Sequence, residues 1–332
     1  MNQAARMQMY DKTAKRPGQL KAFLSKKAVL LIFLVFIIVV AVIKPSFIAP
    51  SNLQNIFMDI SIYGVVACGM TIALLCGEFD LSVSSQFMWA QIFFVTLVNV
   101  MGPAAAILLT LFSGAVLGSI NGLLVTFGKI SSFITTLGTM TIYEGMCLIF
   151  TDGNMVSTAN EAVAAFGNMT LFGVSVLTWI FIAAVILFSL IMKYSAFGRR
   201  IYATGGNIEA AKLAGIKTRF YKYIIFVILG LCAAVAGIMF VTMIRAGSTL
   251  YGTDLAMTAV AAAVIGGTSL SGGRGTIIGT FIGMLIIGTL YKTLIYLGMQ
   301  AYYQNLIKGA VLLVVVVMDV YTQHKNAARR HG

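Results

Sequence analysis

The sequence predicts an all-α polytopic membrane protein with about ten transmembrane helices. Of its 332 residues, 59% are hydrophobic and only 10% are charged, whereas a soluble domain of this length would need more charge to cover its surface. An apolar helix needs about 20 residues to cross a bilayer, so ten helices would use most of the chain. No segment long enough for a soluble catalytic domain remains.

The ten predicted spans are apolar runs divided at charged residues, Pro and Gly. They are 28–43, 61–76, 86–100, 103–127 and 131–150 in the first half of the chain, and 171–192, 223–244, 255–268, 276–297 and 302–321 in the second. The first run ends in Lys44-Pro45 without a small-x-small cleavage site, so we expect an uncleaved span rather than a signal peptide. The runs 61–76 and 255–268 are short and end at Gly, which is typical of helices buried among others or lining a cavity.

Basic residues are concentrated in three parts of the chain. Seventeen of the 23 Lys and Arg residues lie in 1–27, 193–222 and the tail after residue 321. Because positive charge marks cytoplasmic segments, we expect a cytoplasmic N-terminal tail (1–27), a transmembrane domain (28–321) with one long cytoplasmic segment, and a cytoplasmic C-terminal tail (322–332). An even number of spans also places both termini on one side. This segregation argues against nucleic-acid binding, which needs basic and aromatic or polar residues interleaved on one face.

The four cysteines lie inside apolar runs, without CxxC spacing or a flanking His. We therefore expect buried small hydrophobic residues at Cys68, Cys76, Cys147 and Cys232. The sequence predicts no metal ligands, no bound cofactor and no catalytic residue in this chain.

Two spans carry glycines at every fourth position: Gly114, Gly118 and Gly122 in one, and Gly275, Gly279 and Gly283 in the other. At helical spacing each triplet forms a smooth ridge on which another helix can pack closely. The two ridges lie five spans apart and so run in opposite directions, as an inverted repeat of two five-helix halves would require. We keep this 5+5 repeat as a hypothesis beside the simpler interpretation, which is packing alone.

A short helix of about two turns is predicted within the basic segment 193–222. Asn207 is a favourable N-cap, Glu209 lies in the first turn, where the helix dipole favours an anion, and Gly215 is a natural stop. Such a short helix is marginal in water alone, so we expect it to dock onto something.

Two docking partners for this helix are equally favoured by the residues. Ala210 and Ala211 present a surface with almost no side chain, and Leu213 and Ile216 are apolar, which suits docking to a protein. Anionic lipid would instead be bound by the basic side chains Arg199, Arg200, Lys212 and Lys217.

Four blocks of sequence resemble one family of transporters. The run Gly205-Gly-Asn-Ile-Glu-Ala-Ala-Lys-Leu-Ala-Gly-Ile216 is similar to the coupling segment of the ribose/arabinose/galactose-type permeases of bacterial ABC importers. The run Gly77-Glu-Phe-Asp-Leu-Ser-Val83 resembles that family's Asp-Leu-Ser-Val motif, and Ile134-Thr-Thr-Leu-Gly138 and Ala263-Val-Ile-Gly-Gly267 are also similar to family blocks.

The resemblance implies a paired permease in the bacterial inner membrane, either a homodimer or a pair with a related chain. A separate cytoplasmic ATPase would hydrolyse ATP, and an extracytoplasmic binding protein would deliver the sugar. The residues implied to contact the ATPase are Gly205, Gly206, Asn207, Glu209, Ala210, Ala211, Leu213, Gly215 and Ile216.

The ATPase itself is not expected in this chain. Leu270-Ser-Gly-Gly-Arg274 imitates the signature motif of ABC ATPases, but nucleotide hydrolysis also needs a GxxxxGK[ST] loop. The nearest candidate, Gly122 to Lys129, has five residues between its Gly and Gly-Lys and is followed by Ile130. We therefore interpret 271–275 as a short cytoplasmic connection between two spans.

Polar residues in or beside the spans are candidates for the sugar pathway or its gate. They are Asp80, Ser82, Asn121, Thr135, Thr136, Glu144 and Thr258, with Asn55, Asp59 and Thr71 as further candidates. Asp80 with Ser82 is also expected to cap the following helix. Glu144 is a candidate because intramembrane carboxylates are costly and usually functional. It would act as a proton carrier only in a different class of transporter.

The sequence thus predicts the membrane-spanning permease of an ATP-driven importer for a small sugar, a pentose or a hexose. One alternative is an ion-coupled secondary transporter that works without partners. Another is an ABC permease for an autoinducer-like or nucleoside solute, which the sequence does not separate from a sugar permease.

Overall fold

The computed structural model describes residues 33–300, 302–311, 313–314 and 316–317, in two compact units. The first unit ends at Leu53 and contains a helix, Phe33–Ile43, and the 3₁₀ helix η1, Pro45–Ile48. Within it, Asn52 Nδ2 donates a hydrogen bond of 2.7 Å to the carbonyl oxygen of Phe47. This bond fixes the turn before helix α3, which begins at Pro50 and continues into the second unit.

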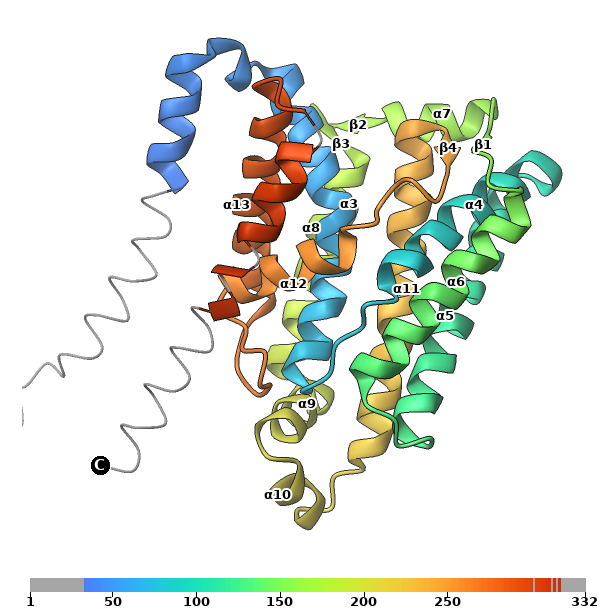
Figure 1. The fold of residues 1–332 in the computed structure, drawn as a ribbon, viewed down its shortest axis with the longest axis vertical. Helices are drawn as coiled ribbons and strands as arrows, with labels where there is room; N and C mark the ends of the chain where they lie inside the picture. Colours follow the sequence, from blue (N-terminus) through green and yellow to red (C-terminus); the bar gives the residue numbers. More distant parts are fainter. Residues whose placement is uncertain (1–32, 301, 312, 315, 318–332) are drawn as a thin grey trace, which may run out of the picture. The chain divides into compact units, whose positions relative to one another are not determined.

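The second unit, from Gln54 onward, is almost entirely helical (Figure 1). Its long helices are α3 (Pro50–Leu75), α4 (Val83–Met101), α5 (Pro103–Thr126), α6 (Ser132–Thr151), α8 (Val176–Tyr194), α11 (Thr218–Ile244) and α13 (Ile277–Tyr296). Its shorter helices are α7 (Glu161–Asn168), α9 (Ala196–Gly206), α10 (Ile208–Leu213) and α12 (Leu255–Ile265). Residues 302–311 are helical as well.

The predicted class, an all-α polytopic membrane protein, is confirmed. In the described part of the chain, seven helices are long and apolar enough to cross a membrane, and Phe33–Ile43 and Leu255–Ile265 are shorter apolar helices. The helices α5 and α6 match the predicted spans 103–127 and 131–150 to within two residues. The predicted first and last spans, 28–43 and 302–321, and both tails lie partly or wholly outside the described residues.

Three predicted boundaries were wrong. Helix α3 begins at Pro50 rather than at residue 61, because Asp59, which suggested a loop, forms an ion pair with Lys292 of α13. Helix α8 begins only at Val176, since residues 170–175 form a hairpin of β2 (Thr170–Leu171) and β3 (Val174–Ser175). Helix α11 begins at Thr218 rather than at residue 223, so its first turns carry charged side chains.

Helix α12 is too short to cross a bilayer. Its 11 residues rise about 16 Å at 1.5 Å per residue, roughly half of a hydrocarbon core. A non-helical segment leads to it from strand β4 (Ala246–Gly247), and Figure 1 shows this segment in orange. The backbone N–H of Ala256 donates 3.0 Å to Ser84 Oγ in the first turn of α4. The first turns of α4 and α12 therefore meet inside the bundle, as expected for interrupted membrane helices.

Helix α3 is the most deeply buried span of the second unit. At Gly64 it leaves space for the ring of Phe181 of α8, and at Gly69 it contacts Cys232 of α11. Thr71 Oγ1 lies 2.6 Å from Thr280 Oγ1 of α13. All four cysteines are free and buried, as predicted.

The two glycine ridges are sites of close helix packing. A Cβ atom on Gly114 would lie 2.5 Å from the carbonyl oxygen of Gly230 on α11, and one on Gly118 would collide with the carbonyl of Phe226. Gly279 and Gly283 meet the backbone of α12 in the same way. Gly275 precedes α13, with φ at +145°, and so belongs to the α12–α13 connection rather than to a helical ridge.

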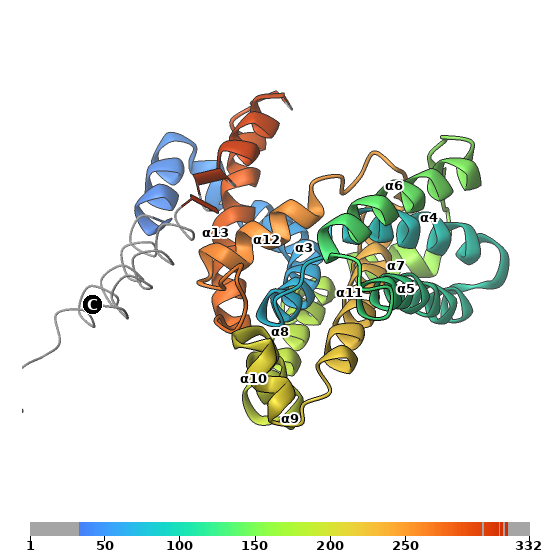
Figure 2. The same ribbon diagram turned by 60° about the horizontal axis from the view of Figure 1, so that its bottom comes forward.

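The loops divide between the two ends of the second unit. Strand β1 (Val156–Ser157) pairs antiparallel with β4 (Val156↔Gly247), and the β2–β3 hairpin and α7 lie at the same end. Helices α9 and α10 lie at the opposite end, as Figures 1 and 2 both show. The segment predicted to be cytoplasmic, 193–222, thus has its short helices at the end of the second unit opposite to the strands and α7.

We predict that Gly118→Ala destabilises the protein by about 1–3 kcal/mol, because the new methyl group must displace backbone of α11. Gly145→Ala on α6 is the control, since a Cβ there meets nothing within 4 Å and Ala favours a helix. The thermal unfolding midpoint in detergent should fall for the first variant and stay level or rise for the second. Equal midpoints would contradict the packing described.

Candidate functional site

The predicted short helix is present as α10, and its ends have the predicted structure. Asn207 Oδ1 accepts hydrogen bonds from the N–H groups of Glu209 (3.1 Å) and Ala210 (3.0 Å). At the other end, Gly215 has a φ of +77°, and its N–H donates 2.9 Å to the carbonyl of Lys212. Six residues are thus held as a helix by a side-chain cap and a left-handed glycine.

The outer face of α10 is exposed and partly apolar. Leu213 is 90% exposed, whereas Ala211 is 3% exposed and faces the rest of the chain. Ala210 is exposed and Ile216 is half-buried. Glu209 and Lys212 form an exposed ion pair of 2.7 Å, which contributes little to stability in water. An exposed leucine beside small residues on so short a helix is a surface suited to a protein groove.

The end of α9 is packed against two other elements through glycines. A Cβ atom on Gly205 would overlap with the carbonyl oxygen of Leu75, the last residue of α3. That carbonyl accepts a 2.9 Å hydrogen bond from the N–H of Gly273, in the α12–α13 connection. A Cβ on Gly273 would lie 2.6 Å from the Cα of Gly206. We call these contacts between Leu75, Gly205, Gly206 and Gly273 the glycine junction.

Tyr202 adds a side-chain bond to the glycine junction. Its hydroxyl donates 2.9 Å to the carbonyl of Gly275. Burial raises the pKa of the Tyr202 phenol above its ordinary value, so the hydroxyl remains protonated and able to donate. The segment that carries α10 is therefore fixed to α3 and to the α12–α13 connection.

A second link joins this end of the chain to the interior. Glu78, in the non-helical segment 76–82 between α3 and α4, forms an ion pair with Lys222 of α11. Glu78 is 7% exposed, so water screens this ion pair less than a surface pair, and loss of either partner would leave the other charge buried and unpaired. Segment 76–82 then continues inward to Asp80.

Asp80 is the centre of a buried polar cluster. Its Oδ1 accepts from the N–H (2.8 Å) and Oγ (2.6 Å) of Ser82, and its Oδ2 accepts from Gln86 Nε2 and Asn121 Nδ2, both at 3.1 Å. Asn121 belongs to α5, and the hydroxyl of Tyr143 of α6 lies 3.3 Å from its Oδ1. The carboxylate thus holds the start of α4 against α5 and α6.

The remaining pathway candidates do not form one site: Asn55, Asp59 and Thr71 lie on α3, and the others lie on α6 and α12. Thr136 Oγ1 accepts 3.1 Å from the N–H of Leu81 and so belongs beside the Asp80 cluster. Thr135 is buried on α6, and its hydroxyl has no hydrogen-bond partner among the described residues. Glu144 is half-buried on α6 and forms no ion pair with a described residue. Thr258 is buried on α12, one turn after Asp254.

A second polar cluster, which the sequence analysis did not assemble, lies at the start of α12. Asp254 Oδ2 pairs with Lys308 Nζ at 2.7 Å, and Asp254 Oδ1 lies 3.5 Å from the hydroxyl of Tyr63 of α3. Lys308 Nζ also lies 5.1 Å from the ring centre of Tyr291. The feature of the sequence that could have predicted this cluster is the pair of lysines, Lys292 and Lys308, which lie in otherwise apolar runs. Carboxylates, amines and tyrosines together offer the hydrogen bonds and apolar faces that a polar solute needs.

Comparison with known proteins gives one family for nearly the whole chain. Residues 52–316 match the family model described as "Branched-chain amino acid transport system / permease component". The chain is 39% identical over 288 residues to the ribose import permease protein RbsC of Bacillus subtilis (strain 168), covering 86% of this chain and 89% of the relative. It is 35% identical over 304 residues to RbsC of Escherichia coli (strain K12), covering 90% and 95%.

A third relative is named for a different sugar. The L-arabinose ABC transporter permease protein AraH of Azospirillum brasilense is 30% identical over 322 residues, covering 96% of this chain and 94% of the relative. The comparison with solved structures gave no match.

We predict that Asp80→Leu destabilises the protein by about 3 kcal/mol or more, because Ser82, Gln86 and Asn121 lose their buried acceptor. Asp80→Asn should cost less: Gln86 Oε1 has no partner among the described residues, so the Gln86 amide can turn and accept from the new Asn. The thermal unfolding midpoint in detergent should be highest for the wild type, lower for Asp80→Asn and lowest for Asp80→Leu. A midpoint of Asp80→Leu equal to that of the wild type would contradict the structural role of Asp80.

Proposed function

This chain belongs to the simple-sugar permease family of ABC importers, and from that premise we propose that it forms the path for a pentose driven by a separate ATPase. It is a multi-pass inner-membrane transport subunit rather than an enzyme. The relatives named above carry ribose or L-arabinose in their names, and both are five-carbon sugars. A binding protein outside the membrane would deliver the sugar, and a second permease copy would complete the path.

The observation that carries the proposal is that the surface of α10 is exposed while the end of α9, which precedes it, is fixed. Leu213 is 90% exposed, yet α10 follows directly on α9, whose end is fixed at the glycine junction. A small helix in a groove of a moving ATPase would make different contacts in its two states, which is what coupling requires. In this arrangement both termini and α10 lie in the cytoplasm.

The motion at α10 has two routes into the membrane. The glycine junction leads to α3 and to the α12–α13 connection, and the Glu78–Lys222 ion pair leads to segment 76–82. Both routes reach segment 76–82, either from the end of α3 or at Glu78, and this segment leads to the first turn of α4, which meets the first turn of α12 at Ser84 and Ala256. Displacing these two helix starts would open or close the path, and the Asp254–Lys308 cluster beside them supplies polar partners for the sugar.

Leu213→Asp and Glu209→Lys should each lower recovery of the partner ATPase at least tenfold, because both side chains lie on the exposed face of α10. Membrane insertion and the thermal midpoint should not change. The measurement is co-purification of the ATPase from detergent extracts.

Glu161→Lys is the matched control, since Glu161 is exposed on α7 at the opposite end. ATPase recovery should equal that of the wild type in this control. Full recovery with both α10 variants would reject the coupling role of α10.

An ion-coupled carrier is the competing function, and Glu144 is its candidate carboxylate. Under our proposal, Glu144→Gln vesicles should take up sugar at the wild-type rate, and uptake should require internal ATP and the ATPase chain. Uptake assays with an imposed proton gradient, with and without ATP, make the distinction. Gradient-driven uptake by the wild type that Glu144→Gln abolishes would overturn the proposal.

A further inference from the structure

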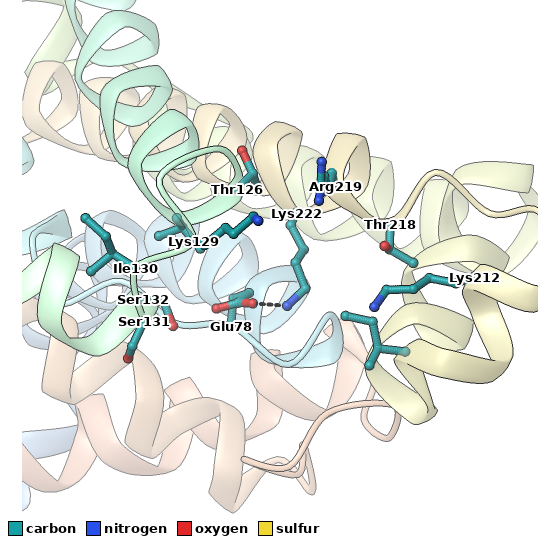
Figure 3. A pocket seen from close by; sticks show the side chains of 12 residues that line it. Glu78, Thr126, Lys129, Ile130, Ser131, Ser132, Lys212, Thr218, Arg219 and Lys222 are labelled. Carbon is teal, nitrogen blue, oxygen red and sulfur yellow. Dashed lines mark hydrogen bonds and ion pairs between the residues drawn. The ribbon is translucent and has the colours of Figure 1, made fainter.

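A cavity of about 420 Å³ lies at the same end of the second unit as α10. Its walls are the start of α11, the side of α10, the α5–α6 connection and Glu78 of segment 76–82 (Figure 3). This volume lies within the roughly 300–1,000 Å³ that is typical of small-molecule sites.

The cavity is strongly basic. Lys129, Lys212, Arg219 and Lys222 line it, and among the described residues Glu78 is the one carboxylate in its wall. Figure 3 shows the amino groups of Lys129, Lys212 and Lys222 directed inward. Four cations around one small space repel one another unless an anion joins them.

The carboxylates present neutralise only half of these cations. Lys222 pairs with Glu78, and Lys212 pairs with Glu209 at 2.7 Å. Lys129 and Arg219 pair with no carboxylate in the part of the chain that the structure describes. Two positive charges are therefore left over, which matches a phosphate dianion.

Hydroxyls and helix starts add donors of the kind that phosphate accepts. Ser131 and Ser132 stand at the start of α6 and Thr218 at the start of α11, and all three line the cavity. Neither helix start has a side-chain cap. In α11 the N–H groups of Thr218 and Phe220 already donate to carbonyls, so the first turn of α6 supplies the free N–H groups, which together with the positive end of the helix dipole favour a bound anion.

The backbone at Lys129 is strained. Its φ is +57°, a left-handed conformation that glycine adopts freely and a lysine adopts at a cost of the order of 1 kcal/mol. This conformation belongs to the connection that carries the unpaired amino group of Lys129 to the cavity. Strain retained where glycine would relieve it is typical of functional positions.

We infer that this cavity binds a phosphate group, carried by a small cytoplasmic phosphate ester or by a lipid headgroup. Lys129 and Arg219 bind the charge, and the hydroxyls of the cavity and the first turn of α6 donate the remaining hydrogen bonds. A bound phosphate would join the α5–α6 connection to α10 and α11, next to the exposed surface of α10. The site does not depend on the proposed transport function.

The test uses the full chain in an uncharged detergent and radiolabelled inorganic phosphate as the probe. Equilibrium dialysis at constant ionic strength should give saturable binding that chloride does not displace. Lys129→Gln and Arg219→Gln should each weaken binding tenfold or more. Lys193→Gln, an exposed lysine at the end of α8 outside the cavity, should stay within twofold of wild type.

Thermal midpoints equal to wild type would show that the variants are folded. Binding that does not saturate, or that falls equally in all three variants, would overturn the inference.

A second arm separates the two sources of phosphate. The chain is placed in nanodiscs of phosphatidylcholine alone or with phosphatidylglycerol, and phosphate binding is measured again. Unchanged binding in both identifies a soluble phosphate ester as the ligand class. Loss of phosphate binding only with phosphatidylglycerol, by competition at the cavity, identifies the headgroup. Failure of both probes to engage the cavity contradicts the site.

Discussion

The close contact between Gly205 and the carbonyl of Leu75 is the constraint on which the arrangement depends. A side chain at Gly205 would occupy the position of that carbonyl, so α9 can end against α3 only because the residue is glycine. The same carbonyl accepts from Gly273, which joins three chain segments at one point. The short helix α10 is thereby attached, through α9, to the most buried span of the second unit.

Elsewhere in the second unit, polar side chains rather than glycines join the helices. A backbone that leaves the helix within a bilayer must find hydrogen-bond partners in the protein. Asp80 supplies them at the start of α4, and Asp254 stands at the start of α12 with Lys308 as its partner. Each aspartate is followed directly by a leucine and stands close before a helix, since α4 begins at Val83 and α12 at Leu255.

Sequence periodicity and end signals predicted most of the helices, and α10 nearly to the residue, because Asn207 and Gly215 act locally. The start of α3 was missed because a distant partner decided the outcome: Asp59 ends a span when read alone, but Lys292 neutralises it within α3. The Asp80 cluster needed Asn121 and Tyr143 from two other helices, and spacing along the chain does not report such contacts. The basic cavity was missed for the same reason, since Lys129 and Arg219 are 90 positions apart.

The central claim is that motion at α10 reaches segment 76–82 through the Glu78–Lys222 ion pair and the glycine junction. The most direct measurement is the amount of sugar transported per ATP hydrolysed, in vesicles containing this chain and its ATPase. Glu78→Lys and Lys222→Glu should each lower that ratio severalfold while the ATPase stays bound, and the double exchange should restore most of it. An unchanged ratio in both single variants would contradict the account.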